Sequence, residues 1–529
     1  MQILSAADMR ACDEATVRLT GISWQELMEN AGSAVARFAA LEFPHAEPIL
    51  VLCGKGNNGG DGLVAARVLE SMGKRVEVIL LSLPEHLEGG PRAAYDKLPA
   101  PLRRSLSIVV TAEDLETHKI ASRMARAGLI LDGVFGTGFH PPLRGVPAAL
   151  QQMLSSIDTP VLAIDLPSGW DADSREQQNE QAFPANAVIT FTAPKVAHIF
   201  GQLTRGSVAV ASIGSPESVV QSSLQLHWAG GAKRIVEIPR PLDSNKGRFG
   251  HVLVAGGSVG KAGAPAMAAL GAMRAGAGLV TTAVPRSLLA IAGGLAPEMM
   301  TLALEETPEG AIALANAEPS RLEAMLRGMT VLAVGSGIGR SHDAAEFARR
   351  IVAQTTLPLV LDADGLNAFD EQPELLNGTG RTLVITPHPG EMARLVGTGI
   401  PEVQQDRVAT ARAFAQSHEC ITVLKGWRTV IAHPDGSVAV NTSGNPALAK
   451  GGSGDVLTGI IAGMLAQFPQ QAREAVETAV WLHGAAADLF VRERDERTML
   501  ATELLNHLSG AIRGPILHDG FTWLQESLP

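Results

Sequence analysis

Short apolar runs, each followed by a glycine-rich polar stretch, recur along both halves of this 529-residue chain. In the first half, an apolar run at 48–53 leads into glycines and asparagines, and a helical pattern follows at 63–72. A second apolar run comes next, at 75–81. The order strand, glycine loop, helix, strand is that of a βαβ unit, which places two parallel strands in one sheet. The pattern therefore predicts an α/β protein.

Further apolar runs follow at the spacing expected for alternating strands and helices. A helical region at 1–40 precedes them, and a helix carrying Trp481 and His483 follows them. In the first half, strands are predicted at 129–132, 161–165, 187–192 and 208–213. In the second half, strands are predicted at 251–257, 330–335, 358–362, 383–386, 421–425 and 429–432.

A change of composition separates the two series of strands. Residues 214–247 are rich in Gly, Pro and Ser and contain only one short strand-like piece, at 234–238. Domain boundaries usually fall in such stretches. We therefore place the boundary near residue 220 and expect domains at 1–220 and 221–529. The two halves share no fixed short period, which excludes a repeat array.

The amino-acid composition limits the classes of protein to which the chain can belong. Hydrophobic residues make up 46% and charged residues 18%, as in a globular protein with large cores. The net charge of −11 argues against binding to nucleic acid or to an acidic membrane surface. Cys12, Cys53 and Cys420 lie too far apart for a disulfide framework or a zinc ribbon. Because neither a signal peptide nor a membrane-length apolar run is present, we expect a cytoplasmic protein.

The glycine stretch of the first half carries unusual polar residues. Its glycines at 54, 56 and 59 match the GxGxxG pattern, but Glu77 lies inside the next strand, so a dinucleotide site is not supported. The run Asn57–Asp61 offers amide and carboxylate oxygens, which suit a hard cation or a polar ligand. The alternative is a turn-rich connection, where these residue types are common.

Acidic residues stand at the ends of two further strands of the first half. Asp132 closes one strand, and Asp165 closes the next, three residues before Ser168. The carboxyl ends of parallel strands meet at one edge of a sheet, where α/β proteins bind ligands. A single such acid is often structural. Together with Asn58, these residues predict a polar site on that rim.

The second half contains a glycine-rich stretch that opens a helix, Gly451–Asp455. Glycine backbone and the free N–H groups of a helix start favour an anion such as phosphate. A carboxylate at Asp455 suits removal of a proton from a hydroxyl that faces the phosphate. The alternative is a helix-capping aspartate. His388 and Glu391 also resemble metal ligands, but without further ligands nearby a loop or substrate role is favoured.

Taken together, these motifs resemble two known families. The second half resembles the ribokinase-like superfamily and, within it, the ADP/ATP-dependent NAD(P)H-hydrate dehydratases. The first half resembles the NAD(P)H-hydrate epimerases. The dehydratase motifs are Gly263–Pro265, Gly335–Gly337, Asp362–Asn367, Thr386–Glu391, Lys425–Gly426 and Gly451–Asp455. The epimerase motifs are Asn57–Asp61, Asp132–Gly136 and Asp165–Asp171. Ser453 stands where threonine is more usual in this family, and it keeps the hydroxyl.

The resemblance implies a fold and a pair of reactions. It implies a Rossmann-like three-layer domain followed by a ribokinase-like α/β domain. The first domain would interconvert the R and S epimers of hydrated NADH or NADPH. The second would phosphorylate the C6 hydroxyl of the S epimer with ADP, after which phosphate leaves and NAD(P)H and AMP remain. The resemblance also implies K⁺ in the epimerase half, Mg²⁺ in the dehydratase half and a homo-oligomer.

The resemblance also assigns roles to individual residues. Asp455 would be the catalytic base of the dehydratase, and Asp165 the acid or base of the epimerase. K⁺ would be bound by Asn58, Asp132 and Ser168. The epimerase substrate would contact Asn57, Asn58, Gly59, Gly60, Asp61, Gly136, Thr137, Gly138, Phe139, His140, Pro141, Pro142 and Asp165. The dehydratase substrate would contact Ala264, Gly337, His388 and Asp455. The nucleotide would contact Lys425, Gly426, Trp427, Arg428, Thr429 and Gly454.

Two other functions fit part of the same pattern. A vitamin-precursor kinase of the ribokinase-like superfamily would share Asp455 and the glycines, but its phosphorylated product would survive. The first half would then be a non-catalytic nucleotide-binding module. Epimerisation of the hydrate by residues 1–220 alone distinguishes an epimerase domain from such a module.

Overall fold

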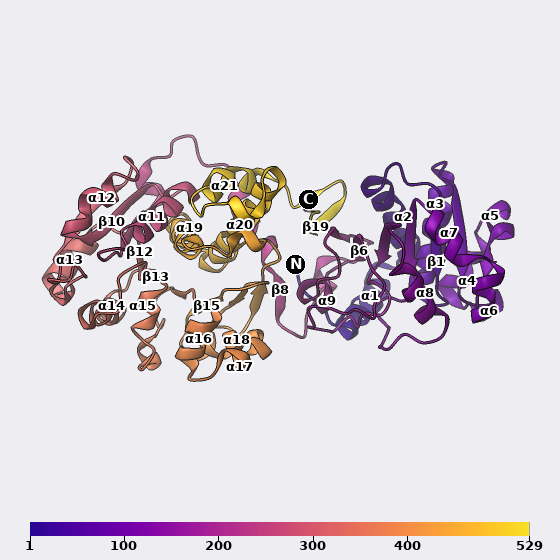
Figure 1. Ribbon diagram of the computed structural model, residues 1–529, viewed down its shortest axis with the longest axis horizontal. Coiled ribbons are helices and arrows are strands. Elements are labelled where there is room, and N and C mark those ends of the chain that lie inside the picture. The colour runs from indigo at the N-terminus through magenta and orange to yellow at the C-terminus, as the bar shows by residue number, and fades with distance from the viewer. Residues whose placement is uncertain (528–529) are drawn as a thin grey trace. The chain divides into compact units, whose positions relative to one another are not determined.

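The computed structural model describes residues 1–527, which form two compact units (Figure 1). The first unit consists of Met1–Leu226 together with the segment that begins at Pro515, and the second consists of His227–Gly514. The predicted ranges differ from these units at the C-terminal end, because the last strands of the chain join the sheet of the first unit. The predicted α/β class is confirmed by one mixed sheet in each unit.

The described part of the first unit contains a nine-stranded sheet in the order β18-β19-β7-β6-β5-β4-β1-β2-β3. The strands from β1 to β7 pair in parallel, whereas β18 and β19 are antiparallel. Their bounds are β1 Ile49–Cys53, β2 Val76–Leu80, β3 Ser107–Ile108, β4 Leu129–Gly133, β5 Val161–Ile164, β6 Ala187–Phe191, β7 Ser207–Ala211, β18 Leu517–His518 and β19 Phe521–Gln525.

Helices cover both faces of this sheet. Val51 of β1 lies in a core with Phe38 and Leu63, whereas its neighbour Leu50 lies in a separate core with Met124. Because successive side chains of a strand point to opposite faces, one apolar strand supplies both cores. The helices are α1 Ala6–Thr20, α2 Trp24–Glu42, α3 Asn57–Ser71, α4 Gly89–Asp96, α5 Ala100–Ser105, α6 Ala112–Thr117, α7 Ile120–Arg126, α8 Val146–Leu154 and α9 Val196–Phe200.

The second unit contains a ten-stranded sheet in the order β11-β10-β9-β12-β13-β14-β15-β16-β17-β8. The strands from β9 to β15 pair in parallel, and the pairs β15–β16 and β16–β17 are antiparallel. The bounds are β8 Leu226–Trp228, β9 His251–Ala255, β10 Leu279–Pro285, β11 Met300–Leu304, β12 Val331–Val334, β13 Leu359–Leu361, β14 Leu383–Ile385, β15 Ile421–Leu424, β16 Val430–Ala432 and β17 Val438–Val440.

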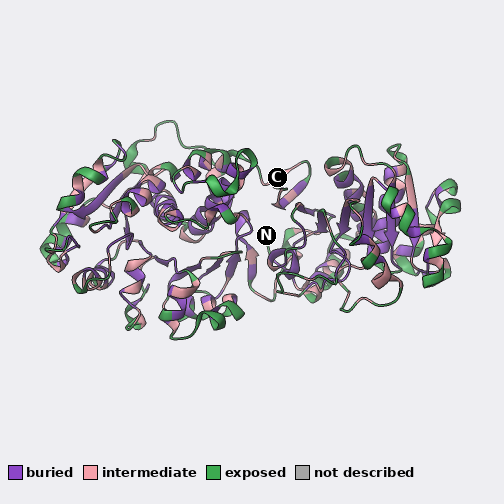
Figure 2. Ribbon diagram, viewed as in Figure 1, coloured by how far each residue is buried: buried purple, intermediate pink, exposed green. Residues whose placement is uncertain are grey.

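The central strands of both sheets are buried, whereas β3, β11 and β18 are partly exposed (Figure 2). In the second unit the covering helices are α10 Arg234–Glu237, α11 Gly263–Ala275, α12 Leu289–Gly293, α13 Pro319–Leu326, α14 His342–Gln354, α15 Asp364–Asn367, α16 Pro389–Val396, α17 Ile400–Gln405, α18 Arg407–Ser417, α19 Ser453–Gln467, α20 Ala472–Glu493 and α21 Leu504–Arg513. Within residues 1–527, no helix combines the length and the apolar character needed to cross a bilayer.

One predicted strand is wrong. Residues 234–238 were expected to be extended, but Arg234–Glu237 form helix α10. The alternation of buried Lys233, exposed Arg234 and buried Ile235 has the period of a strand over so short a run. The Lys233 ammonium donates to the carbonyl of Gly514 at 2.6 Å, and this tertiary contact fixes the segment.

Close packing of α11 and α19 positions the glycine-rich stretch of the second unit. A Cβ on Gly459 of α19 would lie 1.9 Å from the carbonyl oxygen of Ala268, and a Cβ on Gly271 would lie 2.6 Å from that of Val456. Only glycine permits such an approach between two helices. The N-terminal part of α19, which carries Asp455, is therefore held close against α11.

The C-terminal hairpin completes the sheet of the first unit. Strand β19 pairs with β7, and the rings of Phe521 and Trp523 lie 5.2 and 5.6 Å from the ring of Phe38. Phe521 is 1% exposed. The hairpin covers an edge that would otherwise present unpaired backbone groups.

We expect Phe521→Ala to destabilise the first unit by about 3–5 kcal/mol, because it leaves a cavity in the core. The measurement is the urea midpoint of the transition that reports on the first unit. Leu517→Ala on β18 is the matched control, since Leu517 is 64% exposed and its truncation should shift the midpoint little. Equal midpoints for the Phe521 variant and the unmodified chain would show that the hairpin does not stabilise the unit.

Candidate active sites

The glycine stretch of the first unit is mostly helix. The predicted helix began at residue 63, but α3 begins at Asn57, directly after Gly56. A Cβ on Gly59 would lie 1.9 Å from the carbonyl oxygen of Gly54, so the first turn of α3 packs against the end of β1. A glycine run that appears to be a loop in the sequence is therefore a close backbone contact.

The predicted cation ligands of the first unit lie around the peptide of Phe135. Asp132 accepts hydrogen bonds from the hydroxyl of Ser168 at 2.6 Å and from its backbone N–H at 2.7 Å. The Asn58 amide donates to the carbonyl of Phe135 at 2.8 Å, and the Phe135 N–H donates to the Ser168 hydroxyl at 2.9 Å. Burial raises the pKa of Asp132 to about 6, although the hydrogen bonds from Ser168 oppose that shift. The structure therefore brings the three predicted ligands together.

Asp165 lies at the centre of a buried network at the end of β5. Its Oδ1 accepts hydrogen bonds from the ammonium of Lys195 at 2.9 Å and from the hydroxyl of Thr190 at 2.8 Å. Its Oδ2 accepts one from the N–H of Thr137 at 2.9 Å. Burial alone would raise the pKa of Asp165, but Lys195, His198 and Thr137 hold it well below its usual range. Asp165 is therefore an ionised carboxylate.

The pKa of Asp61 moves in the opposite direction. Burial and the nearby negative charge of Asp165 raise the pKa of Asp61 well above its ordinary value. Two carboxyl groups whose environments move their pKa values apart are typical of a general acid and a general base. The first unit thus holds one carboxyl with a raised pKa, Asp61, and one with a lowered pKa, Asp165.

Sequence reasoning missed Lys195. Its side chain is 1% exposed and precedes α9, far along the chain from the glycine motifs. A lysine beside a predicted strand end carries no distinctive spacing. The only available signal was its place after the strand at 187–192, at the same edge of the sheet as Asp165.

The loop at 136–142 divides into two parts. A Cβ on Gly136 would lie 3.1 Å from both Asn58 Oδ1 and Asp165 Oδ2, so the start of this loop borders the carboxylate. The other predicted substrate residues of the first unit lie elsewhere. Phe139 stacks on Phe135, and Gly60 faces Met28 on α2. Gly138, His140, Pro141 and Pro142 are exposed, and His140 lies 3.5 Å from Asp171.

In the second unit, the start of α19 lies beside a lysine. Helix α19 begins at Ser453, and Gly452 before it has a positive φ of 94°. A Cβ on Gly454 would lie 3.6 Å from the ammonium of Lys425. The free N–H groups of this helix start and the ammonium together form a positive site that suits a phosphate.

An ion pair organises the polar groups around that site. Lys425 Nζ lies 2.9 Å from Asp362 Oδ1 and 3.9 Å from Glu391 Oε2. Asp362 also accepts hydrogen bonds from the hydroxyls of Thr386 at 2.7 Å and Thr458 at 2.9 Å. Burial alone would lower the pKa of Lys425, but Asp362 and Glu391 raise it. The lysine therefore stays charged.

Asp455 differs from this paired carboxylate. Burial raises the pKa of Asp455 to about 6, and the negative charges of Asp362 and Asp364 add to the shift, while Ser336 and Lys425 oppose it. A carboxylate with such a pKa exchanges protons near neutral pH, as a general base must. Its place in the first turn of α19 puts that base beside the positive site.

The other predicted hydrate contacts of the second unit lie in two places. A Cβ on Gly337 would lie 3.2 Å from the Cβ of Ala264, so these two residues are neighbours. His388 caps α16. Its Nδ1 accepts a hydrogen bond from the backbone N–H of Gly390 at 2.9 Å, and the backbone N–H of His388 donates to the Glu391 carboxylate at 2.7 Å. The imidazole remains 54% exposed, so it is free to contact a ligand.

The predicted nucleotide residues form a turn held by Arg407. Its guanidinium donates to the carbonyls of Leu424 at 2.9 Å and Lys425 at 3.2 Å. Trp427, on that turn, is 44% exposed, and the guanidinium of Arg428 lies 4.8 Å from its ring centroid. Gly426 has a φ of 145°, and Thr429 donates to its carbonyl at 3.0 Å. Sequence reasoning missed Arg407, because nothing around it in the sequence marks a buried arginine.

Comparison with known proteins finds a family match for each unit. Residues 24–197 match the family described as YjeF-related protein N-terminus, and residues 252–509 match the family described as NAD(P)H-hydrate dehydratase. The chain is 38% identical, over 97% of each protein, to the bifunctional NAD(P)H-hydrate repair enzyme Nnr of Moorella thermoacetica. It is 35% identical to Nnr of Salinibacter ruber, over 95% of each protein.

A solved structure resembles the second unit. The ADP/ATP-dependent NAD(P)H-hydrate dehydratase of Bacillus subtilis, co-crystallised with ATP and Mg²⁺, is 31% identical with a TM-score of 0.44. The match covers 53% of this chain and 95% of that one. The full-length similarity to the Moorella protein, together with the two family matches, confirms that the protein is an enzyme with two activities. The chain belongs to the family of bifunctional NAD(P)H-hydrate repair enzymes.

Proposed function

We propose that the first unit interconverts the R and S forms of hydrated NADH and NADPH, and that the second unit dehydrates the S form. The second reaction consumes ADP and yields NAD(P)H, AMP and phosphate. The observation that carries the proposal is Asp455, a half-buried carboxyl with a raised pKa in the first turn of α19, near the ammonium of Lys425. The expected homo-oligomer and the expected cytoplasmic location stay predictions.

Dehydration requires a better leaving group than hydroxide. Asp455 takes the proton of the C6 hydroxyl while the hydroxyl oxygen attacks the terminal phosphorus of ADP. The bond from that phosphorus to AMP then breaks. The N–H groups at the start of α19 and the ammonium of Lys425 stabilise the charge on the transferred group. The adjacent ring nitrogen then donates its electron pair as phosphate leaves, and loss of a ring proton restores NAD(P)H.

Nucleotide and hydrate occupy different sides of the start of α19 in this proposal. Lys425–Thr429 and Gly454 bind the nucleotide, with the exposed ring of Trp427 available to stack on the base. Ala264, Gly337, His388 and Asp455 bind the hydrate. Mg²⁺ binds mainly to nucleotide phosphates and waters, so it needs few protein ligands. The carboxylates of Asp362 and Glu391 beside Lys425 fit that role, and the ion would neutralise phosphate charge.

Epimerisation at C6 uses the two carboxyl groups of the first unit. Asp61 donates a proton to the C6 hydroxyl, which leaves as water when the ring nitrogen donates its electron pair. The ionised Asp165 then accepts a proton from the water that adds to the opposite face of C6, and a proton returns to Asp61, so that both carboxyl groups regain their starting states. Asn58, Gly136 and Thr137 border Asp165 most closely, and residues 138–142, most of them exposed, contribute the rim of the substrate site.

K⁺ fits the neighbouring group of oxygen atoms. Asp132 is fully buried, and its carboxylate lies with Ser168 beside the carbonyl that accepts from Asn58. A monovalent cation held by Asn58, Asp132 and Ser168 would offset the buried negative charge. Its chemical contribution is positive charge at the base of the substrate site.

The experiment that tests the dehydratase offers hydrated NADPH with ADP, and separately with ATP, and follows the recovery of reduced-nicotinamide absorbance. We expect recovery with ADP. Asp455→Asn should lower kcat by about 10²–10⁴-fold, because the base is lost. Asp243→Asn is the matched control, since the Asp243 side chain is 88% exposed. A stable phosphorylated product in place of NADPH would instead identify a vitamin-precursor type of kinase.

The pH dependence of dehydration should follow Asp455. Because its pKa is raised to about 6, the carboxylate is ionised above that pH and protonated below it. Only the ionised form accepts a proton, so kcat/KM should be constant at neutral pH and fall about tenfold per pH unit below the pKa. A profile of kcat/KM against pH measures this. A rate that is flat through mildly acidic pH would contradict the assignment of the base.

Lys195→Met should affect the first unit alone. It leaves Asp165 as a buried charge without its ammonium partner, which costs about 3–5 kcal/mol of stability. The pKa of Asp165 is depressed in the folded state, so its contribution to stability is present above its unfolded pKa and is lost as the pH falls. The destabilisation should therefore be largest at neutral pH and shrink in acid.

The readouts are urea unfolding at neutral and acid pH, the rate of epimerisation and the rate of dehydration of the S form. We expect epimerisation to fall and dehydration to remain. Lys119→Met, at an exposed lysine, is the control. Normal epimerisation by the Lys195 variant would show that Lys195 does not set the state of Asp165.

A further inference from the structure

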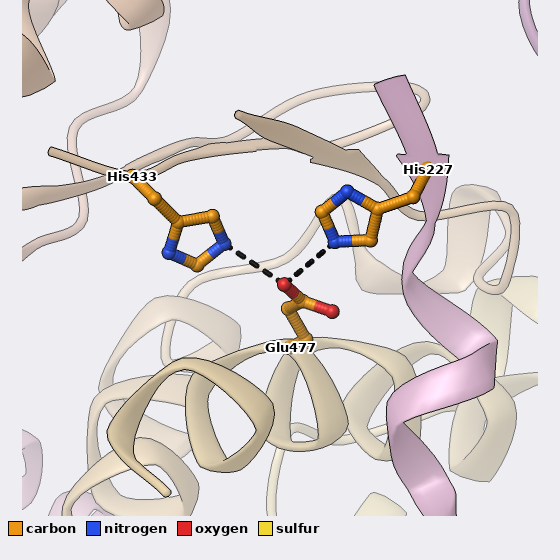
Figure 3. A group of neighbouring side chains, drawn as sticks. All are labelled: His227, His433 and Glu477. Atoms are coloured by element: carbon orange, nitrogen blue, oxygen red, sulfur yellow. Dashed lines mark hydrogen bonds and ion pairs between the residues drawn. The ribbon is translucent and has the colours of Figure 1, made fainter. Parts of the chain in front are cut away.

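Two imidazoles and one carboxylate meet at the β8 edge of the sheet of the second unit, and none of them has a role in the proposed reactions. His227 lies on β8, His433 directly follows β16, and Glu477 lies on α20. Figure 3 shows both rings pointing at the same carboxylate. The Nε2 atoms of His227 and His433 each lie 2.8 Å from Glu477 Oε1.

These side chains are largely withdrawn from solvent. Glu477 is 4% exposed, His433 is 3% exposed, and His227 opens to solvent with 15% of its side chain exposed. Three elements distant in sequence must come together to form such a group, so no local motif marks it. Buried ionisable groups of this kind are costly unless they are paired or bind a metal.

The hydrogen bonds within the group converge on a single atom. Glu477 Oε1 faces both imidazole nitrogens, and Arg473 Nε lies 3.3 Å from the same oxygen. Two imidazole nitrogens and a carboxylate oxygen are the ligand set of many zinc sites, which leave a fourth position to water. The three ligand atoms all lie within 4.8 Å of one another. Tetrahedral zinc needs about 3.3 Å between ligand atoms, so small rotations of the side chains suffice.

We propose that His227, His433 and Glu477 form a binding site for a divalent transition metal, with Zn²⁺ as the best fit. Imidazole ligands favour Zn²⁺ over Mg²⁺ and Ca²⁺. On binding, each ring coordinates through Nε2 and carries its single proton on Nδ1, while Glu477 exchanges two hydrogen bonds for one metal bond. The ion would join strand β8 at the sheet edge to the β16–β17 hairpin and to α20.

Arg473 is the group that opposes metal binding. Its positive charge lies next to the carboxylate that would hold the ion. It has a second partner, Asp435, at 3.0 Å, which offsets its charge and gives it a place when a metal takes Glu477. Removal of this charge should therefore tighten the binding of a cation, whereas a purely hydrogen-bonded cluster would bind no metal in either case.

The test uses the full chain after treatment with a chelator, titrated with Zn²⁺ alone by calorimetry and with Co²⁺ by visible absorption. We expect one equivalent of Zn²⁺ and the absorption bands of tetrahedral Co²⁺. His227→Ala and Glu477→Gln should abolish stoichiometric binding, and Arg473→Gln should tighten it several-fold. His342→Ala is the matched control, because His342 is 82% exposed and distant in sequence from the cluster.

If the Glu477 variant folds poorly, the His227 variant still tests the proposal, because the partly exposed His227 can be replaced with less damage to the core. Circular dichroism checks that the His227 and Arg473 variants are folded. Zn²⁺ should also raise the melting temperature of the unmodified chain and leave that of His227→Ala unchanged. Absence of stoichiometric binding, or binding that survives His227→Ala, overturns the proposal.

Discussion

A buried pair of one lysine and one aspartate lies at the centre of each proposed site. In the first unit Lys195 holds Asp165 at 2.9 Å, and in the second Lys425 holds Asp362 at the same distance. An unpaired charge in such surroundings would be expensive, so each pair requires the strands around it to keep their register. The pair holds one carboxylate in place at the end of a strand. Each site also contains a second carboxyl, Asp61 or Asp455, whose pKa is raised and which can therefore exchange protons.

Much of this arrangement was predictable from the sequence. Asp132, Asp165 and Asp362 each end an apolar run, and parallel sheets bring such ends together, so the polar rims followed from periodicity alone. Asp455 followed from a glycine-rich helix start. The groups that tune these acids were not predictable. Lys195 and Arg407 act through tertiary contacts, and single basic residues carry no pattern that distinguishes a buried partner from a surface charge.

Short segments account for the errors. Buried and exposed residues alternate at 233–235 with the period of a strand, yet contacts with distant residues favour helix α10. The glycine-rich stretch at 54–62 indicated a loop, although close backbone packing makes Gly59, Gly60 and Gly62 part of α3. The group of His227, His433 and Glu477 could not be predicted from the sequence either, because its members are far apart along the chain and meet only in the folded unit.

The position of β19 has a consequence for biosynthesis. The sheet of the first unit takes its strands from the beginning of the chain and from its last described residues, with the whole second unit encoded between them. During translation β7 remains without its antiparallel neighbour until the second unit has been synthesised. Domains usually fold in the order of their synthesis. Here the first unit to emerge is the last to be completed, so the nascent chain carries an open sheet edge while the second unit folds.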